Sequence, residues 1–509
     1  MRYRHARLGM VALALVTAVT MPDRAGAQKK NTLPGRSTTI ALARQDTLVV
    51  VANRDSNTAS VLRIRTPKKR DLQALLAEVP VGIEPRCVAI GPKDREAYVV
   101  NAVSGTVSVI ALTGPRLFTV IATIPVGTEP RGCATSPSRK LLFVANQTAG
   151  TVSVIDTRLR SVIETVNVGG RPTAVAVTND GDKDDADETV FVTDFYAELI
   201  PNGLGEGFDD GKQGVVHFFG AVPPRTPARL TLSPIANVGF TGDRAQFCTQ
   251  FNLAGPNRDM TPANDTFCPD TNATDATAAV IAADPQGAFP NQLASLLIRG
   301  DRAYVPNIGA GPEPPVRFNV NVQALVHVFD TSERSEVSNL HVNLNEQIKA
   351  EVQPDPAEGS LARLFANDVV AIDANPAGTD FLIVSRGGNY VVRAGVDNAG
   401  KLTLNAPNVV RWQTGNLPDG VAITRDGSRA YVNNQANLSV TAINLMASTV
   451  LARDISVGTP PEPGTFAHAV LVGKLAFHTA LGVPDNGIFD MPIRDIEPIR
   501  FRNRASDND

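Results

Sequence analysis

The residues whose types and spacing most clearly suggest ligand binding are the carboxylates of one acidic run, NDGDKDDADE, which begins at position 179. Its alternating aspartates are typical of loops whose side chains converge on one calcium ion. The predicted calcium ligands are Asp180, Asp182, Asp184, Asp187 and Glu188. The run departs from an EF-hand, because Asp185 stands where that loop needs glycine and Phe191 where it needs a bidentate glutamate. Either a calcium ion or a solvated acidic hairpin accounts for the pattern.

The four cysteines form two pairs with different expectations. Cys248 and Cys268 enclose a polar loop, and in an oxidising compartment we expect a disulfide between them that contributes roughly 3 kcal/mol by loop entropy. Cys87 and Cys133 lie in two similar segments, where they either form a disulfide or serve as small buried hydrophobes. No Cys-x-x-Cys-His is present, so the sequence predicts no covalently bound haem in this chain.

Two Glu-Pro-Arg triplets offer a further candidate site. Glu84 and Arg86 recur as Glu129 and Arg131, each pair directly before a predicted strand. They are either structural pairs shared by neighbouring repeats, which is the commoner role of repeated residues in repeat proteins, or a binding site for an anion at the mouth of a central channel.

Catalytic patterns are weak. The five histidines after residue 27 are scattered and form no His-Glu-x-x-His, and no Gly-x-Ser-x-Gly or phosphate-binding glycine loop occurs. His327 lies in the alternating stretch Val-His-Val, which predicts a histidine satisfied within a sheet. The sequence therefore favours a protein that is not an enzyme.

The elements that must position these residues come from a repeat. The hexapeptide GTVSVI occurs at 105–110 and again at 150–155, each time after a Tyr/Phe-Val-x-Asn segment. Looser copies follow along the chain. Each copy holds short β-branched runs with period two, separated by turn residues, and the closing Asn suits a left-handed turn.

One copy is a meander of three or four strands that cannot bury both of its faces, and stacking copies around an axis solves this. We therefore predict an all-β fold, a β-propeller of seven blades with eight as the alternative. Strands from the N- and C-termini are expected to close the ring, with segments 455–459 and 468–477 supplying the inner strand that the first copy lacks. Long loop insertions are expected at about 197–288 and 341–363.

The repeats, among them Tyr98-Val-Val-Asn and Phe143-Val-Ala-Asn, resemble the YVTN-type (YncE-like) family of bacterial β-propeller repeats over roughly 47–480. The stretch from Val472 onward resembles the junction at which such a propeller precedes a cytochrome c module related to di-haem cytochrome c peroxidases. This resemblance implies an electron-transfer context, with a cytochrome c domain or another redox protein as partner.

The N-terminus has the features of a secretory signal. Arg2, Arg4 and Arg7 precede an apolar core, and small residues end at Ala27, which predicts cleavage before Gln28 and a periplasmic or secreted protein. No later segment is apolar enough to predict a membrane span. The expected parts are a signal peptide (1–27), an N-terminal linker (28–46), the propeller (47–480) and a C-terminal tail that resembles the start of a cytochrome c module (481–509).

Composition narrows the functional classes. The net charge of −3 and a charged fraction of 19% predict no nucleic-acid partner. The sequence favours a periplasmic or secreted binding or scaffold module with a protein partner. The alternatives are a lactonase-like propeller enzyme that uses the central channel, and a surface-layer or adhesive repeat protein.

Overall fold

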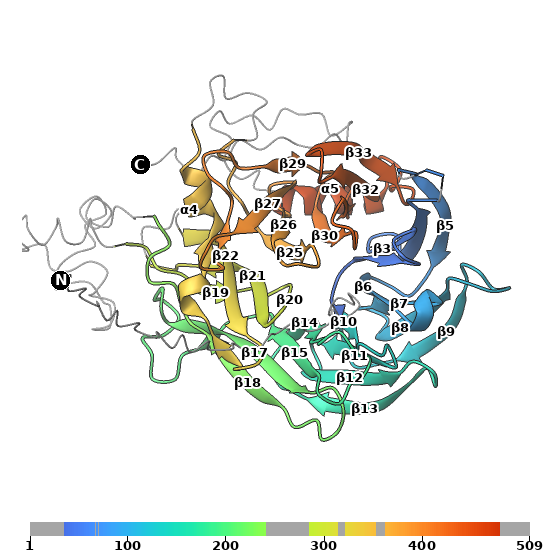
Figure 1. Ribbon diagram of the computed structural model, residues 1–509, viewed down its shortest axis with the longest axis horizontal. Coiled ribbons are helices and arrows are strands. Elements are labelled where there is room, and N and C mark those ends of the chain that lie inside the picture. Colours follow the sequence, from blue (N-terminus) through green and yellow to red (C-terminus); the bar gives the residue numbers. More distant parts are fainter. Residues whose placement is uncertain are drawn as a thin grey trace, which may run out of the picture.

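The computed structural model describes residues 35–66, 68–69, 71–240, 285–313, 321–352 and 362–478. Strands in these residues form seven antiparallel sheets arranged in a ring around a central axis (Figure 1). The prediction of an all-β, seven-bladed β-propeller is therefore confirmed. The described part of the chain contains no eighth sheet that would support the alternative of eight blades.

Four blades are plain meanders of four consecutive strands. Blade 1 contains β2 (Ile40–Ala43), β3 (Leu48–Asn53), β4 (Thr58–Arg63) and β5 (Ala74–Pro80). Blade 2 contains β6 (Pro85–Ile90), β7 (Glu96–Asn101), β8 (Thr106–Ala111) and β9 (Val120–Pro125). Blade 3 contains β10 (Pro130–Thr135), β11 (Leu141–Asn146), β12 (Thr151–Asp156) and β13 (Ser161–Asn167). Blade 7 contains β30 (Pro418–Ile423), β31 (Arg429–Asn434), β32 (Ser439–Asn444) and β33 (Thr449–Ser456).

The other three blades carry additional short strands. Blade 4 contains β14 (Pro172–Val177), β15 (Thr189–Asp194), β17 (Lys212–Gly220) and β18 (Ala228–Leu232), with β1 (Gly35–Arg36) and β16 (Glu198–Leu199). Blade 5 contains β19 (Phe289–Asn291), β20 (Leu297–Arg299), β21 (Arg302–Ala310), β22 (Val322–Asp330), β23 (Ser335–Glu336) and β24 (Val342–Asn343). Blade 6 contains β25 (Val369–Ala374), β26 (Asp380–Ser385), β27 (Tyr390–Val396), β28 (Leu402–Thr403) and β29 (Arg411–Gln413). The helices in the described residues are α4 (Leu344–Lys349) and α5 (Phe466–His478), with short 3-10 turns at Pro92–Asp94 and Ser338–Leu340.

The repeated hexapeptide forms the third strand of its blade, not the outermost one, and this strand is almost wholly buried. The asparagine that ends the second strand reaches across to it: the Asn101 amide donates to Thr106 and Ser108 at 3.1 and 3.0 Å, and Asn146 repeats this with Thr151 and Ser153. The predicted left-handed turn falls instead on the glycine that opens the hexapeptide, with φ of 62° at Gly105. Asn, Gly, Thr and Ser therefore recur together because they form one hydrogen-bonded unit.

The ring closes between blades 7 and 1 by side-chain packing. A shared core joins Ile40 and Val51 of blade 1 to Tyr431 and Val440 of blade 7. The inner strand of blade 1 is β2, which comes from the segment predicted as a linker. The expectation that C-terminal segments supply this strand is wrong, because Ile455 belongs to β33 at the outer edge of blade 7 and residues 466–478 form α5.

The two predicted insertions also contain regular structure. Within 197–288, β17 and β18 complete blade 4, although Gly- and Asp-rich sequence before β17 conceals them. Within 341–363, the described residues include β24 and α4. Residues 241–284 and 353–361 lie outside the described part of the chain.

Residues 35–39, which we call the channel strap, cross the centre of the ring before β2 begins. Gly35 and Arg36 pair with β14 of blade 4, the Val88 N–H of blade 2 donates to Thr38 O at 2.8 Å, and Thr39 Oγ1 donates to Asp419 of blade 7 at 2.9 Å. Gly35 lies so close to blade 3 that a Cβ atom there would be 2.1 Å from Thr135 O, so only glycine fits. The strap thus touches the inner strands of blades on all sides of the central channel.

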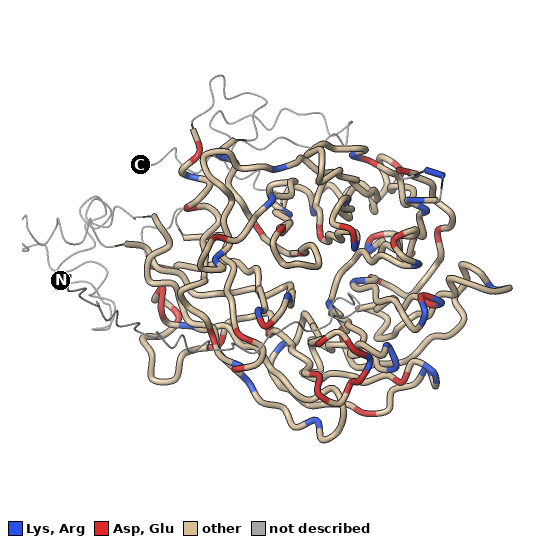
Figure 2. The backbone as a smooth tube through the Cα atoms, viewed as in Figure 1, with Lys and Arg blue, Asp and Glu red and all other residues tan. Residues whose placement is uncertain are grey.

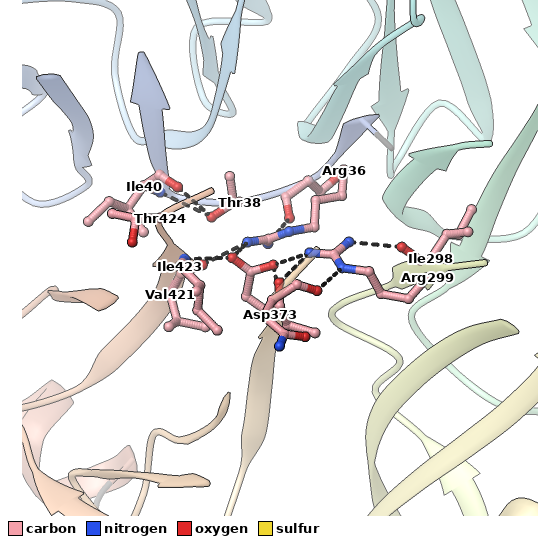
Figure 3. A network of polar contacts seen from close by, with 12 residues as sticks. Arg36, Thr38, Ile40, Ile298, Arg299, Asp373, Val421, Ile423 and Thr424 are labelled. Atoms are coloured by element: carbon pink, nitrogen blue, oxygen red, sulfur yellow. Dashed lines mark hydrogen bonds and ion pairs between the residues drawn. The ribbon is translucent and has the colours of Figure 1, made fainter. Parts of the chain in front are cut away.

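A buried ion cluster anchors the strap. Arg36 and Arg299 point toward Asp373 from two sides (Figure 3), with nitrogen–oxygen distances of 2.9 and 2.8 Å. Asp373 also accepts the Ile423 N–H at 2.8 Å, and Arg36 donates to Val421 O at 2.8 Å. The cluster connects blades 5, 6 and 7 to the strap.

Candidate functional site

The candidate site is a cavity of about 440 Å³ at one mouth of the central channel. The innermost strands begin and the second strands end at this face, as the pairing of Pro85 with Asn101 shows, and we call it the cavity face. Ser37, Thr38 and Thr39 of the channel strap are among its lining residues. Because the strap crosses the channel, it closes the inner end of this cavity, so the mouth is a pocket and not an open passage.

The charged lining residues come from two equivalent positions of the blades. Arg86, Arg131 and Asp419 each follow the proline that begins an inner strand, and Arg54 and Arg386 each follow the last residue of a second strand. Asp368, which directly precedes β25, is the remaining charged residue of the lining. Positions of both signs surround the centre of the ring (Figure 2). With four arginines and two aspartates, the lining has an excess of positive charge.

The predicted Glu-Pro-Arg pairs lie at this mouth. Arg86 pairs with Glu84, and Arg131 pairs with Glu129, within their own triplets. The arginines line the cavity, whereas the glutamates are not part of the lining. Glu84 also accepts Arg54 Nε at 3.0 Å, so one carboxylate serves two guanidinium groups. The structure thus brings the two arginines together at the cavity and leaves both glutamates behind them.

The arginine cluster is electrostatically crowded. Burial, and after it the positive charges of Arg54 and Arg131, lower the pKa of Arg86 to about 9 against the opposing effect of Glu84. Burial opposes ionisation of Glu84, yet Arg86 and Arg54 outweigh it and lower the pKa of this carboxyl group. The Nε atoms of Arg86 and Arg131 are buried and have no hydrogen-bond partner among the described residues. An anion at this place would relieve the repulsion between the guanidinium groups and accept charged hydrogen bonds from these partly exposed side chains.

Asp419 is the exceptional carboxylate of the cavity. Its Oδ1 atom accepts Thr39 Oγ1 at 2.9 Å and Asn433 Nδ2 at 2.8 Å, both neutral donors. Burial raises the pKa of Asp419 to about 6, against the lowering effects of Thr39, Arg386 and Arg54. Asp368, in contrast, is paired with Arg386 at 2.6 Å. Asp419 is thus a titratable group of the cavity with no ion pair in the described part of the chain.

A disulfide supports the arginine side of the cavity. The structure joins Cys87 to Cys133, with Cα atoms 5.9 Å apart. Cys87 follows Arg86 in β6, and Cys133 lies two residues after Arg131 in β10. The bridge therefore fixes the spacing of the two inner strands that carry these arginines. Cys248 and Cys268 lie outside the described residues.

Helix α5 borders the cavity at the same face. Leu471 and Leu475 pack against Leu417 and Ala436 of blade 7, and Phe477 is one of the lining residues. Lys474 forms an ion pair with Asp55 of blade 1. The C-terminal helix is thus held over the junction of blades 7 and 1, beside the mouth.

The predicted calcium residues lie on the opposite face, in the turn between β14 and β15. Asp180, Asp182 and Asp184 are exposed, and each accepts the backbone N–H two residues further along. Glu188 is buried and accepts Thr178 Oγ1 and the Asp180 N–H. Asp187 is exposed. In this arrangement the carboxylates serve the turn itself and do not converge on one point.

Among the described residues, the side chains of His327, Glu336 and His341 place ligand atoms within 4.8 Å of one another. His327 is nevertheless fully used: Asn307 Nδ2 donates to Nδ1 at 2.9 Å, and Nε2 lies 3.0 Å from Ser233 O. Because Asn307 Nδ2 also donates to Val305 O, the amide cannot be reversed, and Nε2 must carry the proton. A metal would need that nitrogen unprotonated, so this group is a hydrogen-bonded junction between blades 4 and 5.

Sequence reasoning missed four charged residues of the cavity, Asp419, Arg54, Arg386 and Asp368. The repeat contains a signal for the first, since Leu417-Pro-Asp419 aligns with the Glu-Pro-Arg triplets and exchanges the sign of the charge. Arg54 and Arg386 follow equivalent strand ends, a position that the repeat motif leaves variable.

Fold and site together define a seven-bladed β-propeller with a strap-closed channel and an arginine-rich mouth. No protein-family model matches the chain, and no curated protein is significantly similar to it in sequence. In the described residues, none of the helices has the length and apolar character needed to cross a bilayer.

Solved structures share the fold at low sequence identity. Hydrazine synthase from Kuenenia stuttgartiensis aligns with a TM-score of 0.54 and 16% identity, covering 82% of this chain and 98% of that one. A protein of unknown function from Desulfotomaculum acetoxidans gives 0.45 with 9% identity, covering 85% and 100%. The dihydro-heme d1 dehydrogenase NirN gives 0.42 with 12% identity, covering 81% and 74%. At such identities the first similarity shows the fold alone.

Proposed function

We propose that this protein is a binding module whose ligand carries a negatively charged group held in the cavity at the channel mouth. The observation that carries the proposal is the crowded cluster of Arg54, Arg86 and Arg131, which lines the cavity and has three guanidinium groups for the two glutamates that pair with it. The volume is within the range of small-molecule sites. The strap supports the proposal because it turns the channel into a pocket that can enclose a ligand.

Calorimetric titration with small carboxylates tests this function. Arg131→Gln should weaken binding by about 10- to 100-fold, since it removes a charged hydrogen-bond donor. Arg139→Gln is the matched control, because Arg139 lies in the same blade and pairs with Asp94, but its turn between β10 and β11 is on the opposite face. Equal binding by wild type and Arg131→Gln would contradict the proposed site.

A turnover assay on the same two proteins, wild type and Arg131→Gln, examines the enzymatic alternative. The described lining of the cavity contains no histidine or cysteine, so it offers no base–nucleophile pair of the usual kind. Turnover of a lactone by the wild type that is lost in Arg131→Gln would replace the binding proposal by a lactonase-like one.

We also propose that a protein partner, a cytochrome c domain or another redox protein, docks on the cavity face. Support comes from α5, whose outer side exposes Phe466 and Val470 beside the mouth. The Cys87–Cys133 disulfide supports the proposal of a periplasmic or secreted location, because such bonds persist in oxidising compartments. Surface plasmon resonance against a cytochrome c domain should show binding that Phe466→Ser weakens; unchanged binding would place the partner elsewhere.

A further inference from the structure

We infer that the ligand of the cavity is a zwitterion of the amino-acid class, with its carboxylate on Arg86 and Arg131 and its ammonium group on Asp419. This inference rests on the proposed function and adds the second charge to it. It concerns the cavity at the channel mouth and uses residues of blades 2, 3 and 7.

The first argument is the separation of charge across the cavity. Arg86 and Arg131 occupy the position after the inner-strand proline in two adjacent blades, and Asp419 occupies the same position in blade 7. Blade 1 lies between blades 7 and 2, and at its inner strand the corresponding place is taken by the uncharged Thr38. The repeat thus presents cations and an anion at one height around the mouth, on different sides of the floor formed by the strap.

The second argument is the state of each charge. The arginine side has three guanidinium groups for two carboxylates, because Glu84 is shared by Arg54 and Arg86. On the other side, Arg386 is committed to Asp368, and the hydrogen-bond partners of Asp419 are neutral. Asp419 is half-buried and its direct hydrogen-bond partners are neutral, so an ammonium group beside it would add a charged hydrogen bond that the protein itself does not supply. A ligand with both charges therefore satisfies both sides at once, which a simple anion cannot do.

Binding of such a ligand is coupled to protons. The charged and titratable groups that face Asp419 are Arg386 after β26, its partner Asp368 before β25, and Arg54 after β3; Thr39 and Asn433 are its neutral contacts. A bound ammonium group lowers the pKa of Asp419 from its value of about 6, so a zwitterion releases a proton and binds more tightly as pH rises. A bound simple anion raises that pKa, so it takes up a proton and binds more weakly as pH rises.

The experiment uses pairs of probes matched in length. Amino acids with a terminal ammonium group, from glycine to δ-aminovalerate, are compared by calorimetry with the corresponding anions from acetate to valerate. At pH about 7, the best zwitterion should bind at least about tenfold more tightly than its partner, the value of one charged hydrogen bond. From pH roughly 5.5 to 7.5, where the probes themselves barely titrate, affinity should rise for the zwitterion and fall for the anion.

Variants then locate the second charge. Asp419→Asn should abolish the preference for the zwitterion and leave the affinity for the simple anion unchanged or higher, whereas Asp71→Asn, at an exposed ion pair away from the cavity, should change neither. If Asp419→Asn fails to fold, the opposite pH slopes of the wild type still decide. Equal or weaker binding of every zwitterion relative to its matched anion would overturn this inference and leave the proposed anion site standing. Absence of binding by all probes would overturn both.

Discussion

The cluster around Asp373 makes the clearest stability prediction. Asp373→Asn preserves the shape of the side chain but removes the charge that both Arg36 and Arg299 share, and all three side chains are at most 10% exposed. Burial and the charge of Arg36 lower the pKa of Arg299 to about 10, and the charge of Asp373 opposes them, so the aspartate is what makes two adjacent guanidinium groups tolerable. Removing one partner from a buried ion pair costs about 3–5 kcal/mol.

Thermal unfolding followed by circular dichroism measures this effect. For a domain of about 400 residues, the average unfolding entropy per residue converts the loss into a decrease of roughly 4–6 °C in the melting temperature. Asp71→Asn, which breaks the more exposed ion pair with Arg429, should cost less than about 1 kcal/mol. Adding Arg36→Met to Asp373→Asn should recover part of the loss, since it removes one of the two unpaired cations. A decrease of under about 1 °C in Asp373→Asn, or no recovery in the double variant, would refute the role given to the cluster.

Three further outcomes are expected. Replacing Cys87 and Cys133 by alanine should lower the free energy of unfolding by about 4 kcal/mol in thermal or urea denaturation, from the loop entropy of a sequence separation of 46; no change would show that the bridge does not constrain the unfolded chain. Because the carboxylates of the turn between β14 and β15 do not converge, millimolar calcium should shift the melting temperature by less than about 1 °C. A larger rise that is lost in the double variant Asp182→Asn, Asp184→Asn would establish the calcium site instead. Burial, and then the charge of His341, lower the pKa of His327 well below 6.5, so its contribution to stability is complete above pH 6.5 and is lost as pH falls below that value. In urea denaturation at pH 5 to 7, His327→Gln should therefore reduce the slope of the unfolding free energy against pH by up to about 1.4 kcal/mol per pH unit. An unchanged slope would contradict the assignment.

The sequence repeat was sufficient to predict the propeller architecture. A hexapeptide with period-two alternation, written twice at a fixed interval, predicts strands that pack on both faces, and the ring follows because no single blade can bury them. The same local chemistry placed Arg86 and Arg131 before inner strands and hence at a channel mouth. The predicted left-handed turn at Asn101 and Asn146 was wrong, because a hydrogen bond to the next strand satisfies the side-chain amide as well as a turn does. Only the pairing register decides between the two arrangements.

By itself, the sequence determined the propeller, the position of the arginine triplets and the absence of a haem-binding motif, since each depends on residues close together in the chain. The tertiary structure alone decided what lies across the ring. Gly35 and Arg36 follow no repeat pattern, yet they lie in the channel, where Arg36 pairs with Asp373, more than 300 residues away in the chain. Asp419 faces the arginines only because the ring closes between blades 7 and 1. Contacts of this kind depend on closure of the whole ring, and no local pattern of residue types encodes them.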